Sequence, residues 1–162
     1  MKDQIRLKEA ALNLSWINLL VAGLAIIAGG LIYILCRPGN FSFFGWFHLI
    51  GLSDELTYLR AHALPTFNHL PSWFSYSLPD GLWAFAYTLI ILTIWTSSKS
   101  ITRYFWYASI PLFVLGSELL QLSGTVRGTF SLNDIVLISI GLLAGVLTGI
   151  ITPKKLNYES KN

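Results

Sequence analysis

Four apolar stretches dominate this chain and restrict the folds that it can adopt. They cover about residues 14–35, 82–95, 104–122 and 132–151. A helix needs roughly 20 apolar residues to cross a bilayer core. Three of the stretches are about this long, and the second approaches it if flanking residues on both sides are included. Backbone groups in lipid find no water to bond, and spanning segments are therefore helices. The sequence predicts an all-α integral membrane protein with four transmembrane helices.

The composition fits one membrane domain over residues 1–152, followed by a short cytoplasmic tail at 153–162. Of the 162 residues, 54% are hydrophobic, which is too many for a soluble fold of this size. The lone cysteine, Cys36, excludes an internal disulfide. The first stretch is too long for a cleavable signal and no A-x-A-like site follows it, so we expect it to be retained. The sequence carries no nucleic-acid-binding signature.

Lysine and arginine are distributed unevenly among the segments that connect the stretches. Eight of them lie before the first stretch, between the second and third, or after the fourth; the other side holds only Arg37, Arg60 and Arg127. Because cytoplasmic segments carry the excess of these residues, both termini are predicted to be cytoplasmic. The net charge of +3 follows from this asymmetry. The segment at 36–81 is then predicted to face outward.

Residues 36–81 form the longest connection, and a connection of this length is rarely plain linker. It is rich in aromatic residues, which settle at the headgroup level of a membrane. We expect one or two interfacial helices over Phe44–Ala63, with a helix start at Ser53. The prolines of this segment are predicted to break it: Pro65, Pro71 and Pro79. The prediction is a long, partly helical interfacial outer loop.

All three histidines, His48, His62 and His69, fall in this loop. They lack the close pairing of metal-binding motifs, and a histidine at an interface is commonly an amphipathic residue with a wet ring edge. We predict neither a metal site nor a cofactor.

The second and fourth stretches begin with matching polar headers. Ser77-Leu78-Pro79-Asp80 opens one, and Ser131-Leu132-Asn133-Asp134 opens the other. A serine followed three residues later by an acid is a helix-start box, in which the two side chains bond N–H groups of the first turn. An acid at the rim of a membrane helix is also a candidate functional group. Both interpretations stay open for Asp80 and Asp134.

More polar residues precede the second header. Glu118 and Gln121 are neighbours on the third predicted helix, and Arg127 follows in the turn. Three carboxylates close together cannot all ionise cheaply, so we expect at least one of them to hold a proton or to pair with Arg127. Such a polar rim suits acid/base chemistry or capture of a headgroup. The candidate catalytic residues are Glu118, Asp134 and Asp80, and the candidate substrate-binding residues are Gln121, Arg127, Ser131 and Tyr87.

Small residues mark the faces on which helices are predicted to pack. At about 100° per residue, Gly141 and Gly145 fall near Asp134 on one side of the fourth stretch, and Gly149 follows. Glycines four residues apart let helix backbones approach closely. We predict helix packing for these three glycines, and also for a small-residue stripe on the first stretch: Asn18, Ala22, Ala25 and Gly29.

The residues from 118 onward resemble the VanZ-like family of bacterial membrane proteins. The pattern is Glu118-x-x-Gln121, a turn with glycine and arginine, then Ser131-Leu132-x-Asp134, with Gly141 and Gly145 behind it. An aspartate that opens an aromatic-rich helix, with a tyrosine further on, is similar to Asp80 and Tyr87. The resemblance covers roughly residues 78–149, less than half of the chain.

This resemblance implies a bacterial cytoplasmic membrane protein with a role in the cell envelope. The family's name comes from a protein that gives low-level resistance to the glycopeptide teicoplanin, and its biochemical activity is not established. The chain also departs from the family. Gly81 and Ala84 stand where members often carry lysine and histidine, the family's arginine aligns with Gly128, and its asparagine on the last helix aligns with Ile138.

Three functions remain open on the sequence. The first is a cell-envelope protein whose rim binds a membrane lipid or a lipid-linked headgroup, with a link to antibiotic tolerance. The second is an enzyme that acts on a phospholipid or polyprenyl-linked substrate, with Glu118 or Asp134 as base and Arg127 on an anionic group. The third is a non-catalytic bundle that assembles with a partner membrane protein, or with itself, through its glycine faces.

Overall fold

The computed structural model describes residues 2–37, 44–67, 69–96, 98–124 and 131–159, without the side chains of residues 2–11, 44, 113–115, 117–119, 122 and 151–159. Within these ranges the chain is helical and contains no strand. Its helices are α1 (Lys2–Cys36), α2 (Phe44–Leu49), α3 (Ser53–Phe67), α4 (Ser72–Tyr76), α5 (Leu78–Trp95), α6 (Thr102–Leu122) and α7 (Leu132–Glu159). The predicted all-α class is confirmed.

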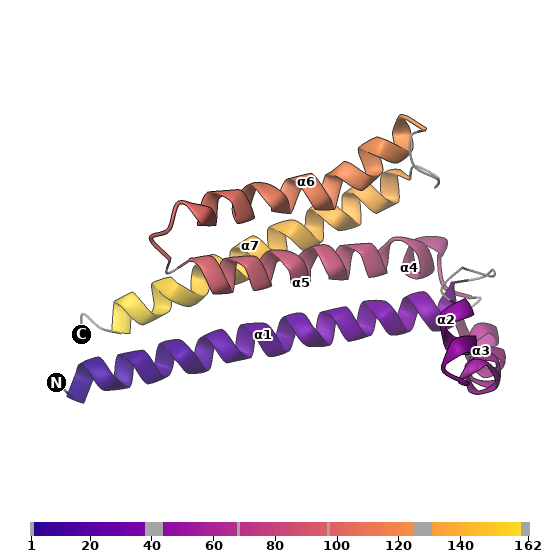
Figure 1. Cartoon of the computed structure of the whole chain (residues 1–162), viewed down its shortest axis with the longest axis horizontal. Coiled ribbons are helices and arrows are strands. Elements are labelled where there is room, and N and C mark those ends of the chain that lie inside the picture. Colours follow the sequence, from indigo (N-terminus) through magenta and orange to yellow (C-terminus); the bar gives the residue numbers. More distant parts are fainter. Residues whose placement is uncertain (1, 38–43, 68, 97, 125–130, 160–162) are drawn as a thin grey trace.

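The four long helices run alternately in opposite directions (Figure 1). α1 and α6 run toward one end of the bundle, and α5 and α7 run back from it. Both ends of the chain lie where α1 begins. The short helices α2 to α4 gather at the opposite end, together with the end of α6 and the start of α7. We call this opposite end the loop end.

Three of the described helices are long and apolar enough to cross a membrane. They contain the candidate spans Leu12–Cys36, Leu78–Trp95 and Leu132–Ile150. These spans support the prediction of a membrane protein. The second begins at Leu78, four residues before the apolar stretch, because Pro79 occupies the first turn of α5, where a proline needs no hydrogen-bond donor. α6, the predicted remaining span, is a helix of 21 residues but is not among these three.

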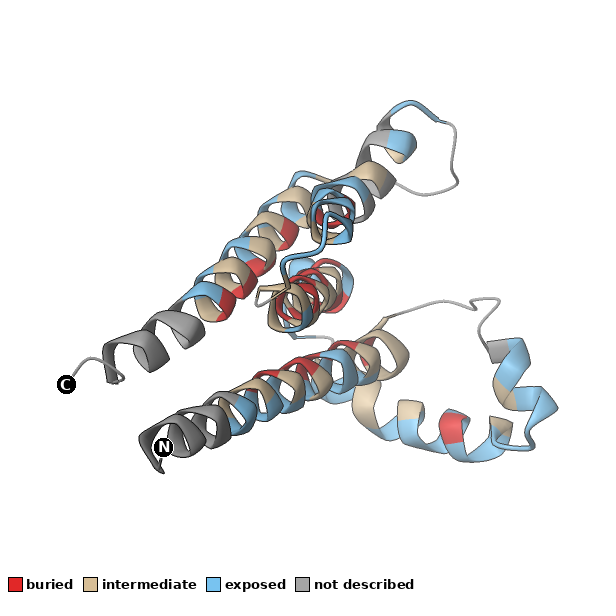
Figure 2. Cartoon of the chain, turned by 60° about the vertical axis from the view of Figure 1, so that its left-hand side comes forward, coloured by how far each residue is buried: buried red, intermediate tan, exposed pale blue. Residues whose placement is uncertain are grey.

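α5 is the central helix, packed between α1 and α7 (Figure 2). Its contact with α7 is a close approach of two backbones. A Cβ at Gly145 would lie 2.8 Å from the carbonyl oxygen of Phe85, and one at Gly149 would lie 2.9 Å from Cβ of Leu92. Gly141 meets the backbone of Gly81 in the same way. The glycine face of α7 is therefore covered by α5 of the same chain.

The other side of α5 packs against the small-residue stripe of α1. The structure buries all four residues of that stripe, Asn18, Ala22, Ala25 and Gly29, as the sequence predicts. Hydrogen bonds between described side chains and the neighbouring helix also join α1 and α5. Asn18 Nδ2 donates to Thr93 Oγ1 at 3.3 Å, and Trp83 Nε1 donates to the carbonyl of Ile26 at 3.3 Å.

Two helices, α2 and α3, lie where one or two helices are predicted, and α3 begins at Ser53 as expected. The prediction that Pro65 breaks the segment is wrong, because Pro65 lies inside α3. A proline in the last turn of a helix removes only one hydrogen bond, and the side chain of Pro65 is exposed. Pro71 precedes α4 and Pro79 begins α5, so these two prolines do mark helix boundaries.

Candidate functional site

The two predicted headers lie at the loop end, on helices that run in the same direction (Figure 1). Asp80 is half-buried in the first turn of α5, and Asp134 is half-buried in the first turn of α7. Ser77 precedes α5 but makes no side-chain capping bond, and its own backbone is already helical, with φ −101° and ψ −32°. A side-chain cap requires an extended backbone at that position. The helix-start box is therefore not formed by Ser77.

Asp134 lies where α4, α5 and α7 come together. Gly141 meets the backbone of α5 at Gly81 and Phe85. Asp134 lies two helical turns before Gly141 on α7. Because α5 and α7 run in the same direction, Asp134 is then at the level of Ser77, where α4 meets α5. α4 also contacts α7 there. The carboxylate therefore faces a three-helix junction at the rim.

One oxygen of this carboxylate is buried without a hydrogen bond. Asp134 Oδ1 is closed off from solvent and has no partner among the residues that the structure describes. The backbone N–H of Asp134 donates to the carbonyl of Ser131 at 3.2 Å. Buried polar atoms are nearly always bonded, and an unsatisfied acceptor costs about 1–3 kcal/mol. Within the described part of the chain, Asp134 Oδ1 is thus a buried acceptor at the rim that receives no hydrogen bond.

The remaining rim residues are described in part. Ser131 is half-buried, and its carbonyl accepts from the N–H of Ile135 at 3.3 Å. Gln121 is half-buried in the last turn of α6, which Gly124 ends with φ +72°, a conformation that favours glycine. Two predicted site groups lie outside the described residues: the side chain of Glu118, and Arg127 as a whole.

Tyr87 lies further along α5, away from the headers. Its hydroxyl bonds Ser109 Oγ of α6 at 2.7 Å, and the Ser109 hydroxyl is also 2.6 Å from the carbonyl of Trp106. Nearby, Trp95 of α5 stacks on Trp106 of α6 with ring centroids 6.1 Å apart. Tyr87 therefore links α5 to α6, and a substrate group would have to compete with Ser109 for its hydroxyl.

Arg60 is a residue whose role the sequence did not reveal. It lies on α3, and its guanidinium donates to the carbonyls of Ile34 and Arg37, the latter at 3.0 Å. These carbonyls belong to the end of α1, where helix carbonyls have no partner within the helix and the dipole favours a cation. Arg60 therefore caps α1 from 26 residues further along the chain.

Arg37 fixes α4 to the same point. Its guanidinium carbon lies over the ring of Tyr33 at 4.8 Å and over the ring of Tyr76 at 5.1 Å, measured to the ring centroids. Cations are attracted to aromatic faces at such distances. The end of α1 thus holds α3 through Arg60 and α4 through Arg37.

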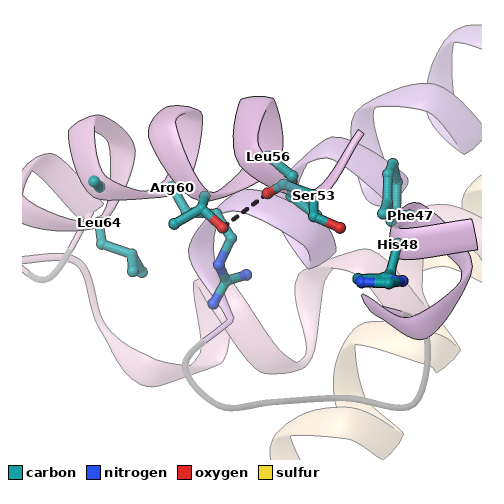
Figure 3. Close-up of a pocket in the computed structure, with 8 residues that line it drawn as sticks. Phe47, His48, Ser53, Leu56, Arg60 and Leu64 are labelled. Atoms are coloured by element: carbon teal, nitrogen blue, oxygen red, sulfur yellow. Dashed lines mark hydrogen bonds between the residues drawn. The ribbon is translucent and has the colours of Figure 1, made fainter. Parts of the chain in front are cut away.

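A pocket of about 450 Å³ opens between α2 and α3 (Figure 3). Arg60 and His48 lie on its two sides, and Phe47, Leu56 and Leu64 supply apolar surface. Ser53, Thr57 and Ala61 complete the lining, and Thr57 Oγ1 is bonded to the carbonyl of Ser53 at 2.8 Å. This volume lies within the usual range for small-molecule sites.

The histidines do not come together. His48 lines the pocket, whereas His62 contacts Tyr58 on the exposed side of α3 with ring centroids 4.3 Å apart, and His69 is exposed. Within the described ranges no three His, Cys, Asp or Glu residues are grouped as metal ligands would be.

Comparisons with known proteins add no relative to this description. No protein-family model, no curated protein and no solved structure matches the chain.

Proposed function

We propose that this chain is a multi-pass cell-envelope protein of VanZ-like type that binds the headgroup of a membrane lipid or a lipid-linked molecule at its polar rim. α6 serves as its fourth span. The loop end faces outward from a bacterial cytoplasmic membrane, and both termini are cytoplasmic. Antibiotic tolerance would follow from the occupancy of the rim, because the envelope molecules that such drugs meet carry these headgroups.

The observation that carries the proposal is the buried Oδ1 of Asp134, which has no donor among the residues that the structure describes. A negatively charged acceptor at a membrane rim suits a headgroup that brings N–H or O–H donors, such as a primary ammonium or a sugar hydroxyl. Asp80 opens the neighbouring parallel helix at the same end of the bundle. The rim is thus suited to a donor-bearing headgroup rather than to a phosphate alone.

The outer faces of the long helices support contact with lipid chains. Large apolar side chains are exposed along the sides of α1 and α7 that face away from α5, among them Leu20, Leu24, Ile27, Leu143 and Leu147. The glycines of α7 are not on such a face, since α5 covers them. A partner membrane protein would therefore have to dock on another surface.

The test compares two lipids that differ in their donors. Phosphatidylethanolamine carries N–H donors on its headgroup, whereas phosphatidylcholine carries none. The unfolding midpoint of the purified full chain in neutral detergent should rise more with phosphatidylethanolamine, because a ligand that binds only the folded state stabilises it. Asp134→Asn removes the charge but keeps the size, so it should abolish this difference.

Asp54→Asn is the matched control, because Asp54 is an exposed aspartate in the first turn of α3. It should leave the difference between the lipids unchanged. An Asp134→Asn variant that still prefers phosphatidylethanolamine would contradict the proposal. Conversion of the added lipid to a product of different mass would instead identify an enzyme at this rim.

A further inference from the structure

We propose that the pocket between α2 and α3 is a second lipid site, distinct from the rim, that binds the anionic headgroup of a membrane lipid. Arg60 and His48 would contact the anion, and an acyl chain would lie along Phe47, Leu56 and Leu64. The pocket combines a guanidinium and an imidazole with apolar side chains in a single opening (Figure 3). Such a lining suits a ligand with an anionic group and a hydrocarbon chain.

Arg60 brings a positive charge to the pocket, and its hydrogen bonds hold the guanidinium in a fixed position. The carbonyls of Ile34 and Arg37 accept hydrogen bonds from the guanidinium and orient it. Among the described residues that line the pocket none is acidic. A guanidinium fixed in this way is pre-organised, and guanidinium groups bind phosphate and carboxylate oxygens well. The ligand therefore does not have to order the arginine.

His48 approaches the pocket from the opposite side (Figure 3). A neutral imidazole has one N–H donor and a charged one has two, so His48 has a donor for an anionic oxygen in either state. It belongs to α2 whereas Arg60 belongs to α3. An anion between them would join the two short helices of the loop.

The surroundings favour a membrane lipid as the occupant. The outer surface of α2 exposes Trp46 (65%) and Leu49 (81%), and Ile50, which follows the helix, is 66% exposed. Such a surface beside membrane spans belongs at the headgroup level of a bilayer, where tryptophan is enriched. The pocket mouth would then open among lipid headgroups. A soluble anion would leave the apolar wall of the pocket unfilled.

The site is tested with defined probes on the purified full chain in neutral detergent. Native mass spectrometry should show that phosphatidylglycerol is retained about tenfold more strongly than phosphatidylcholine. A gain in affinity of about tenfold is typical of one additional charge-assisted contact. Arg60→Gln should remove this preference, and Arg60→Lys, which keeps the charge, should keep part of it. Arg103→Gln is the matched control, because Arg103 also donates to a backbone carbonyl, that of Ser98, but lies at the other end of the bundle.

Arg60 also caps α1, so a second variant tests the pocket without disturbing that cap. Ala61 lines the pocket and is exposed, and Ala61→Phe would fill the space for the chain. It should lower phosphatidylglycerol retention while the unfolding midpoint stays unchanged. Unaltered retention in Ala61→Phe, or equal retention of the two lipids, would each overturn the proposal. The preference of the rim for ethanolamine is measured separately, so either site can fail alone.

Discussion

The α carbon of Gly141 faces the carbonyl oxygen of Gly81 so closely that a Cβ on Gly141 would overlap that oxygen. A backbone oxygen cannot rotate aside as a side chain can. The two helices would have to separate along the contact that holds α7 to the bundle. At this point of the contact, the distance between α5 and α7 therefore requires a residue without a Cβ at position 141.

Gly141→Ala is expected to destabilise the folded chain. Overpacking in a tight interface typically costs about 1–3 kcal/mol, and a backbone obstacle belongs at the upper end. The unfolding midpoint in detergent measures the effect. Gly30→Ala is the control, because a Cβ on Gly30 of α1 meets nothing within 4 Å, and it should leave stability unchanged or raise it. Equal stability of both variants would contradict the close approach.

Asn18 and Thr93 are expected to be energetically coupled. The Asn18 side chain is 5% exposed and donates to Thr93 Oγ1 between α1 and α5. Hydrogen bonds between membrane helices contribute on average about 0.6 kcal/mol in double-mutant cycles. A cycle with Asn18→Leu and Thr93→Val, followed by thermal unfolding, should give a coupling energy of that size. Additive effects of the two substitutions would show that this contact contributes nothing.

Several features of the fold can be predicted from the sequence because they depend on local patterns. The apolar stretches locate the long helices, and the spacing of Asn18, Ala22, Ala25 and Gly29 identifies the face of α1 that packs. Ser53 marks the start of α3 because acids follow it in the first turn. These signals depend on periodicity and helix-end chemistry, which neighbouring residues determine.

The tertiary contacts of the loop end cannot be predicted in this way. Arg60 caps a helix that ends 24 positions earlier in the chain, and no local pattern pairs it with Ile34. The pocket forms only when α2 folds back on α3. At the rim, the headers place Asp80 and Asp134 on first turns, but burial of one oxygen of Asp134 depends on how α4, α5 and α7 meet.

Cysteine labelling should reveal the orientation of the bundle in the membrane. His69, between α3 and α4, and Lys99, between α5 and α6, are exposed, and these two connections lie at opposite ends of the bundle. In a Cys36→Ser background, His69→Cys should react with an impermeant reagent added to intact cells, and Lys99→Cys should react only after lysis. This follows from the excess of lysine and arginine on the side of the termini. The reverse pattern would place the rim and the pocket in the cytoplasm.

Lipid contact of α2 is expected to appear in tryptophan fluorescence. Trp46 is 65% exposed, whereas Trp83 is half-buried and packs against Gly29 of α1. In variants that keep one of these tryptophans and replace the others by phenylalanine, lipids brominated near the headgroup should quench Trp46 strongly and Trp83 weakly. Similar weak quenching of both would show that α2 stands away from the membrane.

The central place of α5 has a consequence for how the chain is made. α5 is the least apolar of the three candidate spans, and its helix carries Asp80 and buried glycine and threonine. α5 is synthesised before α7. The face of α5 that packs on the glycines of α7 is therefore uncovered until α7 has been made. α1 is the long helix that is synthesised before α5, and its small-residue stripe packs against the other face of α5. We therefore expect α1 and α5 to pair first as an antiparallel hairpin, in which α1 covers one face of α5 until α7 has been synthesised.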